Sequence, residues 1–254
     1  MPLFQSSVIK NHDRTLDSIA IKAAWQRFQL HFADPVKQDN IRKAKEEQYQ
    51  EGFLRELFVD VLGYTLNPQP GYDLITEQKN EKDGKKADGA LLKAGAVRGV
   101  IELKGTDTTD LGKIEKQAFG YLTSHKDCVY VVISNFEKLR FYVQNSTEHE
   151  EFNLFTLTEE RFRLLWLLLQ KNQIAQDIPL KLKEQSVAQE DQVTRKLYAD
   201  YSAFKKALFA DIVARNAGHD KVELYRKTQK LLDRFLFVLF AEDRGLLPPN
   251  SVRN

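Results

Sequence analysis

Apolar residues recur at helical spacing near the start of the chain. Between residues 13 and 32 they return every three or four positions, which predicts an amphipathic helix that ends before Asp34-Pro35. A second helix is predicted over residues 36–62, with Gly63 as its stop signal. Its apolar stripe consists of Phe53, Leu54, Leu57, Phe58, Val61 and Leu62. Two helices are therefore expected ahead of any strand.

Shorter runs of apolar and β-branched residues follow. They predict a strand over residues 72–78, a hairpin of residues 86–92 and 97–104 around a small-residue turn, and strands over residues 128–135 and 139–143. A helix is predicted over residues 111–122, between the hairpin and the last two strands. This order of elements predicts an α/β fold with a mixed sheet flanked by helices.

The remainder of the chain is predicted to be helical. An apolar run over residues 162–169 indicates a buried helix that is too short to span a membrane. Residues 174–185 are predicted to be a linker, followed by helices over residues 186–215 and 221–243. The last helix is expected to bury Tyr225, Leu232, Phe235, Leu236, Leu239 and Phe240. We therefore expect one domain over residues 1–172 and an α-helical region over residues 173–254.

The predicted hairpin brings charged side chains together. If its strands pair symmetrically about Gly95, Asp88 lies opposite Glu102, and such partners are about 5 Å apart. The strand period of two places Lys104 on the same face as Glu102, with Leu103 on the other face. Two carboxylates this close repel each other unless a proton or a cation lies between them, and Mg²⁺ prefers oxygen ligands of this kind. The pattern predicts metal-assisted phosphodiester hydrolysis, with the lysine orienting or activating a water molecule.

These residues resemble the motif of PD-(D/E)xK nucleases. Asp88 and, after the hairpin, Glu102-Leu103-Lys104 occupy the motif positions, with Ala87 where the family usually has a proline. The resemblance implies a restriction-endonuclease-like core and a Mg²⁺ ion held by Asp88 and Glu102. The proline is not a metal ligand in that family, so its replacement leaves the implied chemistry intact.

Two predicted helices carry further candidate residues. Glu51 lies three residues before Leu54 and shares the inward stripe, where a carboxylate is costly unless it is paired or bound to a metal. The family often has an acidic residue on the helix before the sheet, so the resemblance makes Glu51 the candidate and Glu47 the second choice. A solvated glutamate at the end of the stripe is the alternative. On the later helix, Gln117 and Tyr121 match a Gln-x-x-x-Tyr pattern of several such families, which implies that Gln117 positions the lysine or a phosphate, although the two side chains could simply pair with each other.

Further segments resemble a narrower family. Residues 101–106, 116–121 and 134–142 are similar to the N-terminal nuclease region of type IIG restriction–modification enzymes, and residues 228–237 and 241–248 resemble their helical connector. The resemblance implies a type II site-specific deoxyribonuclease that acts on double-stranded DNA, with a transient dimer for double-strand cleavage. The sequence has neither a glycine-rich cofactor loop after a strand nor an Asn-Pro-Pro-Tyr-like motif. We therefore expect a fragment, with S-adenosylmethionine used only by a methyltransferase part outside it.

Two other functions remain open at this point. One is a catalytically silent DNA-binding or scaffold module of the same fold. The other is the nuclease part of a type I restriction subunit, which would need helicase motifs that this sequence does not contain.

Composition narrows the class of protein. The chain has 254 residues, of which 42% are hydrophobic, and a formal net charge of +2, so any DNA contact has to come from local patches. Lys82, Lys85 and Lys86 are candidates for phosphate contacts, although a charged run of this kind is more often a solvated loop. Its one cysteine, Cys128, excludes an internal disulfide and a cysteine-based zinc site, and is expected to be a buried strand residue. No apolar stretch reaches 18 residues and no signal-peptide pattern is present. We expect no membrane association and a cytoplasmic location.

Overall fold

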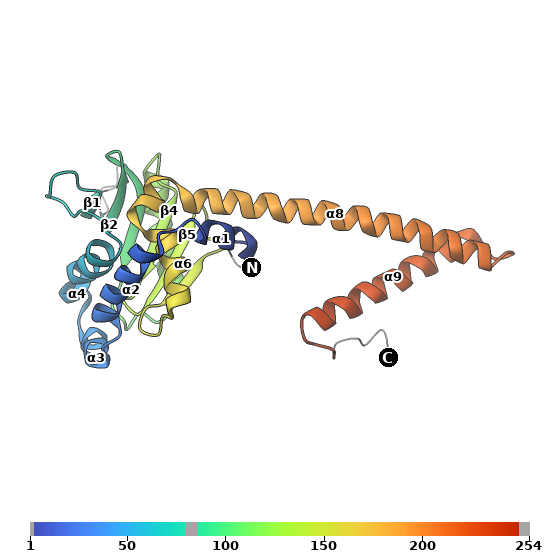
Figure 1. Ribbon diagram of the computed structural model, residues 1–254, viewed down its shortest axis with the longest axis horizontal. Coiled ribbons are helices and arrows are strands. Elements are labelled where there is room, and N and C mark those ends of the chain that lie inside the picture. The colour runs from blue at the N-terminus through green and yellow to red at the C-terminus, as the bar shows by residue number, and fades with distance from the viewer. Residues whose placement is uncertain (1–2, 80–85, 249–254) are drawn as a thin grey trace. The chain divides into compact units, whose positions relative to one another are not determined.

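The chain folds into two compact units. The computed structural model describes residues 3–79 and 86–248. The first unit is Met1–Val187 and the second is Ala188–Asn254, so the chain divides further along than the expected boundary after residue 172. Figure 1 shows the helices and strands of each unit, and many of them are labelled.

A six-stranded sheet forms the centre of the first unit. Its strands are β1 (Leu74–Lys79), β2 (Lys86–Lys93), β3 (Ala96–Leu103), β4 (Tyr130–Ser134), β5 (Lys138–Val143) and β6 (Glu150–Asn153). They lie in sequence order, and every neighbouring pair is antiparallel except β3 and β4. A parallel pair needs a crossover connection, which here contains α5 (Gly112–Ser124). The prediction of an α/β fold with a mixed sheet flanked by helices is confirmed, whereas β6 was not predicted.

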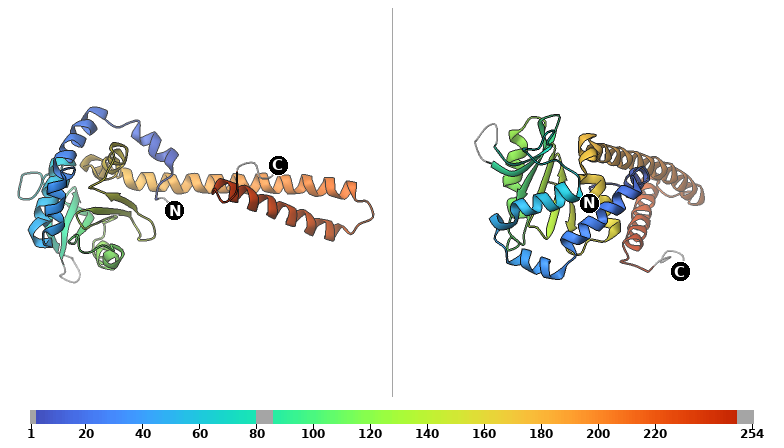
Figure 2. Two further views of the ribbon diagram at one scale, coloured as in Figure 1. Left: turned by 90° about the horizontal axis from the view of Figure 1, so that it is seen from below. Right: turned by 60° about the vertical axis from the view of Figure 1, so that its left-hand side comes forward.

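Helices cover both faces of this sheet (Figure 2). One face packs against α5 through a cluster that includes Val100, Ile114 and Tyr121. The other face packs against the N-terminal helices and α6 through a larger cluster. The helices besides α5 are α1 (Ser6–Asp13), α2 (Ser18–Phe32), α3 (Pro35–Lys43), α4 (Glu46–Phe53), the π-helix η1 (Leu54–Val61), α6 (Glu159–Leu169), α7 (Lys171–Ala175) and the start of α8 (Ile178–Arg215). Alternate side chains of β3 therefore pack into two separate hydrophobic cores, one on each face of the sheet.

The N-terminal helices are more broken than the sequence predicted. The Asp17 side chain accepts hydrogen bonds from the backbone N–H groups of Ile19 and Ala20, so α2 starts at Ser18 rather than near residue 13. The single helix predicted over residues 36–62 is three elements. Its first break is at Ala44, whose backbone is extended (ψ 143°), and its last eight residues form η1.

The hairpin of β2 and β3 has the predicted register, but a tight turn and a bulge that were not predicted produce it. Ala94 and Gly95 both have positive φ (50° and 81°) and form a two-residue turn, so Lys93 pairs with Ala96. A bulge between Leu91 and Leu92 then shifts the register by one residue, after which Gly89 pairs with Ile101. The Gly89–Ile101 pair is the register that symmetric pairing predicted, with Asp88 and Glu102 as the next residues along the two chains.

Helix α8 starts earlier than expected, because residues 174–185 are largely helical rather than a linker. Its first turns pack on the first unit, where Leu182, Lys183 and Ser186 are buried. The Lys183 ammonium donates to the backbone oxygen of Val143 at 2.6 Å, and the Ser186 hydroxyl accepts from the backbone of Gln5 at 2.9 Å. These contacts hold the start of α8 to the first unit.

The second unit consists of the rest of α8 and of α9 (Lys221–Asp243). The prediction that α9 buries most of its large apolar residues is wrong for all except Leu232. The others are exposed, at 43% for Tyr225, 37% for Phe235, 44% for Leu236, 53% for Leu239 and 57% for Phe240. Across the part of the chain that the structure describes, no helix combines the length and the apolar character needed to cross a membrane.

Candidate active site

The candidate site lies where the β2–β3 hairpin ends. The Asp88 carboxylate accepts a hydrogen bond from the backbone N–H of Leu103 at 2.7 Å, which ties β2 to the end of β3. The Lys104 ammonium lies 3.0 Å from the Glu102 carboxylate, while Leu103 belongs to the core on the opposite face of the sheet. The side chains of Glu102 and Leu103 therefore lie on opposite faces of the sheet. Asp88, Glu102 and Lys104 lie together at the end of the hairpin, as predicted.

Glu102 is the most deeply buried acid of the site, at 1% exposure. Its Oε1 atom receives two donors, the Gln117 amide at 2.6 Å and the Lys104 ammonium at 3.0 Å. Its Oε2 atom is buried and has no hydrogen-bond partner among the described residues. An unpaired buried carboxylate oxygen is costly, so this atom is available for a ligand that the protein itself does not supply.

Burial raises the pKa values of both acids, and repulsion by Asp88 adds to the effect on Glu102. Desolvation, followed by the nearby Asp88 carboxylate, raises the pKa of Glu102 to about 7, although Lys104 opposes the shift. Desolvation also raises the pKa of Asp88, against the hydrogen bond from Leu103. Burial is the largest single effect on Lys104 and lowers its pKa. The hydrogen bond to Glu102 and the attraction of the Glu102, Asp88 and Glu46 carboxylates together outweigh burial, so the pKa is raised. Lys104 therefore stays an ammonium group at neutral pH.

Helix α4 supplies two residues that the sequence did not single out. The Glu46 carboxylate lies 3.2 Å from the Lys104 ammonium, and the Gln50 side chain is close enough to Asp88 to lower the pKa of that carboxyl. The two positions are one helical turn apart and share a face. The prediction that Glu51 faces inward is wrong, because its side chain is 67% exposed and pairs with Arg55. Glu47, the second choice, is also exposed.

Gln117 reaches the site as expected, but its partners there are Glu102 and Tyr121 rather than the lysine or phosphate that the resemblance implied. From α5, its amide donates both to Glu102 and to the Tyr121 hydroxyl, the latter at 3.1 Å. The side chain therefore holds a site carboxylate while also pairing with the tyrosine one turn later. Desolvation raises the pKa of Tyr121, so its hydroxyl stays protonated at neutral pH.

The donor set fits a hard divalent cation held by two carboxylates. Asp88 and Glu102 are adjacent, and Glu102 has an unused buried oxygen. Within residues 3–79 and 86–248, no group of three or more His, Cys, Asp and Glu side chains is close enough to hold a metal ion. Mg²⁺ commonly uses only one or two protein carboxylates and completes its shell with waters and phosphate oxygens. Lys104 and Glu46 are partly exposed, so solvent reaches the site from their side.

The expected lysine patch is only partly described. Lys82 and Lys85 lie outside the described residues. Lys86 is exposed and pairs with Glu77 at 2.8 Å. A surface ion pair of this kind contributes little to stability, so the ammonium of Lys86 can exchange partners.

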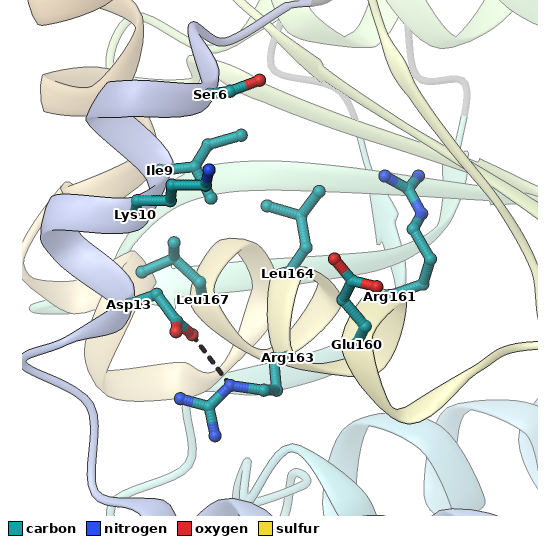
Figure 3. Close-up of a pocket in the computed structure, with 9 residues that line it drawn as sticks. All are labelled: Ser6, Ile9, Lys10, Asp13, Glu160, Arg161, Arg163, Leu164 and Leu167. Carbon is teal, nitrogen blue, oxygen red and sulfur yellow. Dashed lines mark hydrogen bonds and ion pairs between the residues drawn. The ribbon is translucent and has the colours of Figure 1, made fainter.

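A hollow of about 290 Å³ lies elsewhere in the first unit, between α1 and α6 (Figure 3). It brings Lys10, Arg161 and Arg163 together, but two of these cations are already paired. Arg163 lies 3.0 Å from Asp13, and Arg161 lies 3.3 Å from Glu150. None of the predicted site residues lines this hollow, so it is not part of the candidate active site.

Comparisons of the chain with known protein families, with curated proteins and with solved structures found no match.

Proposed function

We propose that this chain is a Mg²⁺-dependent DNA endonuclease with a PD-(D/E)xK core, belonging to a type IIG restriction–modification enzyme. The observation that carries the proposal is the pairing of Asp88 with Glu102, whose buried Oε2 atom has no partner among the described residues, beside the ammonium of Lys104. Two repelling carboxylates next to a fixed cation are the groups that metal-assisted phosphodiester hydrolysis requires.

Each residue has a distinct role in this proposal. Asp88 and Glu102 would hold the cation, and Glu102 releases its proton when it does so. When bound, Mg²⁺ would polarise the scissile phosphate and lower the pKa of a coordinated water. Lys104 remains charged, so it stabilises developing negative charge and orients the water rather than accepting a proton. Gln117 holds Glu102 in place through its 2.6 Å hydrogen bond.

The proposed partner is double-stranded DNA. One hydrolytic centre cuts one strand at a time, so a transient dimer would supply the second centre for a double-strand break. S-adenosylmethionine would serve only a methyltransferase part of such an enzyme.

Lys104→Ala tests the chemistry. The 254-residue chain is expected to nick supercoiled plasmid weakly and without sequence preference in Mg²⁺ or Mn²⁺. Removing the ammonium should lower the nicking rate on the order of 10²–10³-fold, because one preorganised charged group of this kind typically contributes that much. Conversion of supercoiled to open-circular DNA gives the rate.

Lys181→Ala is the matched control, because Lys181 is exposed on α8 and lies outside the site. It should cut at the wild-type rate, and circular dichroism should show that both variants are folded. Undiminished nicking by Lys104→Ala would remove Lys104 from the reaction. Metal-dependent DNA binding without any nicking by the wild type would favour the silent scaffold instead.

Asp88→Asn tests the metal. Calorimetric titration with Mn²⁺ should show binding to the wild type and a loss of affinity of about tenfold or more in the variant, because one of two charged ligands becomes neutral. Bound Mn²⁺ should also raise the melting temperature of the wild type by mass action. Equal affinity in the two proteins would place the metal elsewhere.

A further inference from the structure

Tyr49 lies in the same turn of α4 as Glu46 and Gln50, the two residues that reach the site. Glu46 contacts Lys104 at 3.2 Å, and Gln50 lies close enough to Asp88 to lower the pKa of that carboxyl. Tyr49 precedes Gln50 and points to the core side of the helix. A small rotation of α4 about its axis would therefore move both contacts at once, and whatever fixes Tyr49 fixes them.

A hydrogen bond and a ring contact hold the Tyr49 side chain in place. Its hydroxyl donates to the Glu56 Oε2 atom at 2.5 Å, and the other oxygen of Glu56 accepts from the Lys37 ammonium at 2.7 Å. The ring packs edge-on against Phe136, with 5.1 Å between the ring centroids. Tyr49 therefore contacts η1 and the turn between β4 and β5 directly, and it is linked to α3 only through Glu56.

The absence of a side chain at Gly52 makes room for this ring. A Cβ atom added there would lie 3.1 Å from Cδ2 and 3.3 Å from Cε2 of Tyr49, which is closer than ordinary contact. Glycine is otherwise unfavourable inside a helix relative to alanine. The close approach of the ring to the helix backbone therefore gives a structural reason for a glycine at this position.

We propose that Tyr49 is a positioning residue of the candidate active site, which fixes the rotation of α4 so that Glu46 meets Lys104 and Gln50 meets Asp88. The inference rests on the proposed nuclease function for its effect on rate, but its structural content does not. Tyr49 itself touches neither the metal ligands nor a reacting group. It acts through Glu46 and Gln50.

The first readout reports the Lys104–Glu46 contact without any reaction. Lysines are labelled by reductive ¹³C-methylation, and the Lys104 signal is assigned by its absence in Lys104→Arg. Glu46→Gln should shift this signal, because the ammonium loses a charged neighbour. Tyr49→Phe and Gly52→Ala should shift it in the same direction, the first by removing the hydroxyl contact and the second by displacing the ring.

Tyr64→Phe is the matched control. The Tyr64 hydroxyl is also buried and donates one hydrogen bond, to the backbone oxygen of Leu169 at 2.8 Å, away from the site. The Tyr64→Phe variant should lower the free energy of unfolding, as Tyr49→Phe does, but should leave the position of the Lys104 signal unchanged. An unshifted Lys104 signal in folded Tyr49→Phe and Gly52→Ala would overturn the proposal.

The second readout is the rate of plasmid nicking. Tyr49→Phe should lower it about tenfold or more, because small displacements of positioned groups have effects of this size. The Tyr49→Phe/Glu46→Gln double variant should be less impaired than the product of the two single effects, since both act through the same contact. Fully multiplicative effects would contradict the shared route. A wild type that never nicks DNA, together with the expected Lys104 shifts, would refute the nuclease proposal and leave the positioning role standing.

Discussion

At the scale of single residues, Glu102 makes the metal-free protein sensitive to pH. Its pKa is about 7 in the folded state and 4.5 in the unfolded reference, so folding favours the protonated form. The stabilising contribution is complete below about pH 4.5 and is lost as the pH rises through 7. Glu102→Gln should therefore be more stable than the wild type at pH 8.5, by on the order of 3 kcal/mol, and differ little at pH 5. Urea unfolding in EDTA at both pH values measures this.

The control for this prediction is Glu184→Gln, a change at an exposed position of α8. It should alter stability equally little at both pH values. Adding Mg²⁺ at pH 8.5 should narrow the gap between wild type and Glu102→Gln, because the cation replaces the proton between the acids. A Glu102→Gln variant no more stable at pH 8.5 than at pH 5, relative to wild type, would contradict the raised pKa.

The residues of the site differ in how far sequence could predict them. Asp88, Glu102 and Lys104 followed from the strand period of two and one turn signal, both of which are local rules. Glu46 and Gln50 did not, because their orientation depends on η1. A π-helix has more than 3.6 residues per turn, so a stripe extended back from Phe58 at α-helical spacing points to Glu51 instead.

At the scale of elements, Asp177 fixes the start of α8. It has a positive φ of 54°, which is uncommon for a residue with a side chain. Its carboxylate accepts from Lys93 at 2.5 Å, from Arg98 at 2.7 Å and from Tyr130 at 3.2 Å. Asp177→Ala should lower the free energy of unfolding by about 3 kcal/mol, because two cations lose a largely buried partner. Urea denaturation gives the value.

Asp177→Asn separates charge from backbone conformation in the same experiment. Asparagine tolerates positive φ and keeps one acceptor oxygen, so it should lose clearly less than alanine. An alanine variant as stable as the wild type would show that these contacts do not anchor α8.

Element boundaries were harder to predict wherever distant contacts set them. The β2–β3 register was correct because a two-residue turn and a bulge together place the strands as a symmetric loop would have done. The start of α8 was missed because Lys183 and Ser186 are polar in sequence yet buried against the first unit. A hydrogen bond to Val143, forty positions away, is not visible in a local pattern.

At the scale of the whole molecule, the first unit should fold without the second. Both apolar clusters of the described chain are complete by Leu182, within residues 1–187. A chain ending at residue 187 should therefore melt within about 5 °C of the full chain, because a loss of 1 kcal/mol shifts the midpoint of a domain this size by only a few degrees. Thermal unfolding followed by circular dichroism is the measurement.

Residues 188–254 provide the complementary experiment. Their buried residues within the described range are Leu224, Thr228, Leu232 and Ala241. So small a core should give a broad, weakly cooperative transition when this segment is expressed alone. An unfolded chain 1–187 would contradict the independence of the first unit, and a sharp transition of residues 188–254 would contradict the weak core inferred for the second. Hydrophobic spacing correctly predicted that α9 is a helix, but it did not predict that most of its large apolar side chains are exposed.

The single cysteine can report how often the native sheet opens. Cys128 lies just before β4, is only 6% exposed, and burial raises the pKa of its thiol to about 12. Alkylating reagents attack the thiolate, so they reach this sulfur only during the moments when the central strands separate. The rate at which the intact protein reacts with such a reagent, followed by mass spectrometry without denaturant, therefore measures how often the central strands separate.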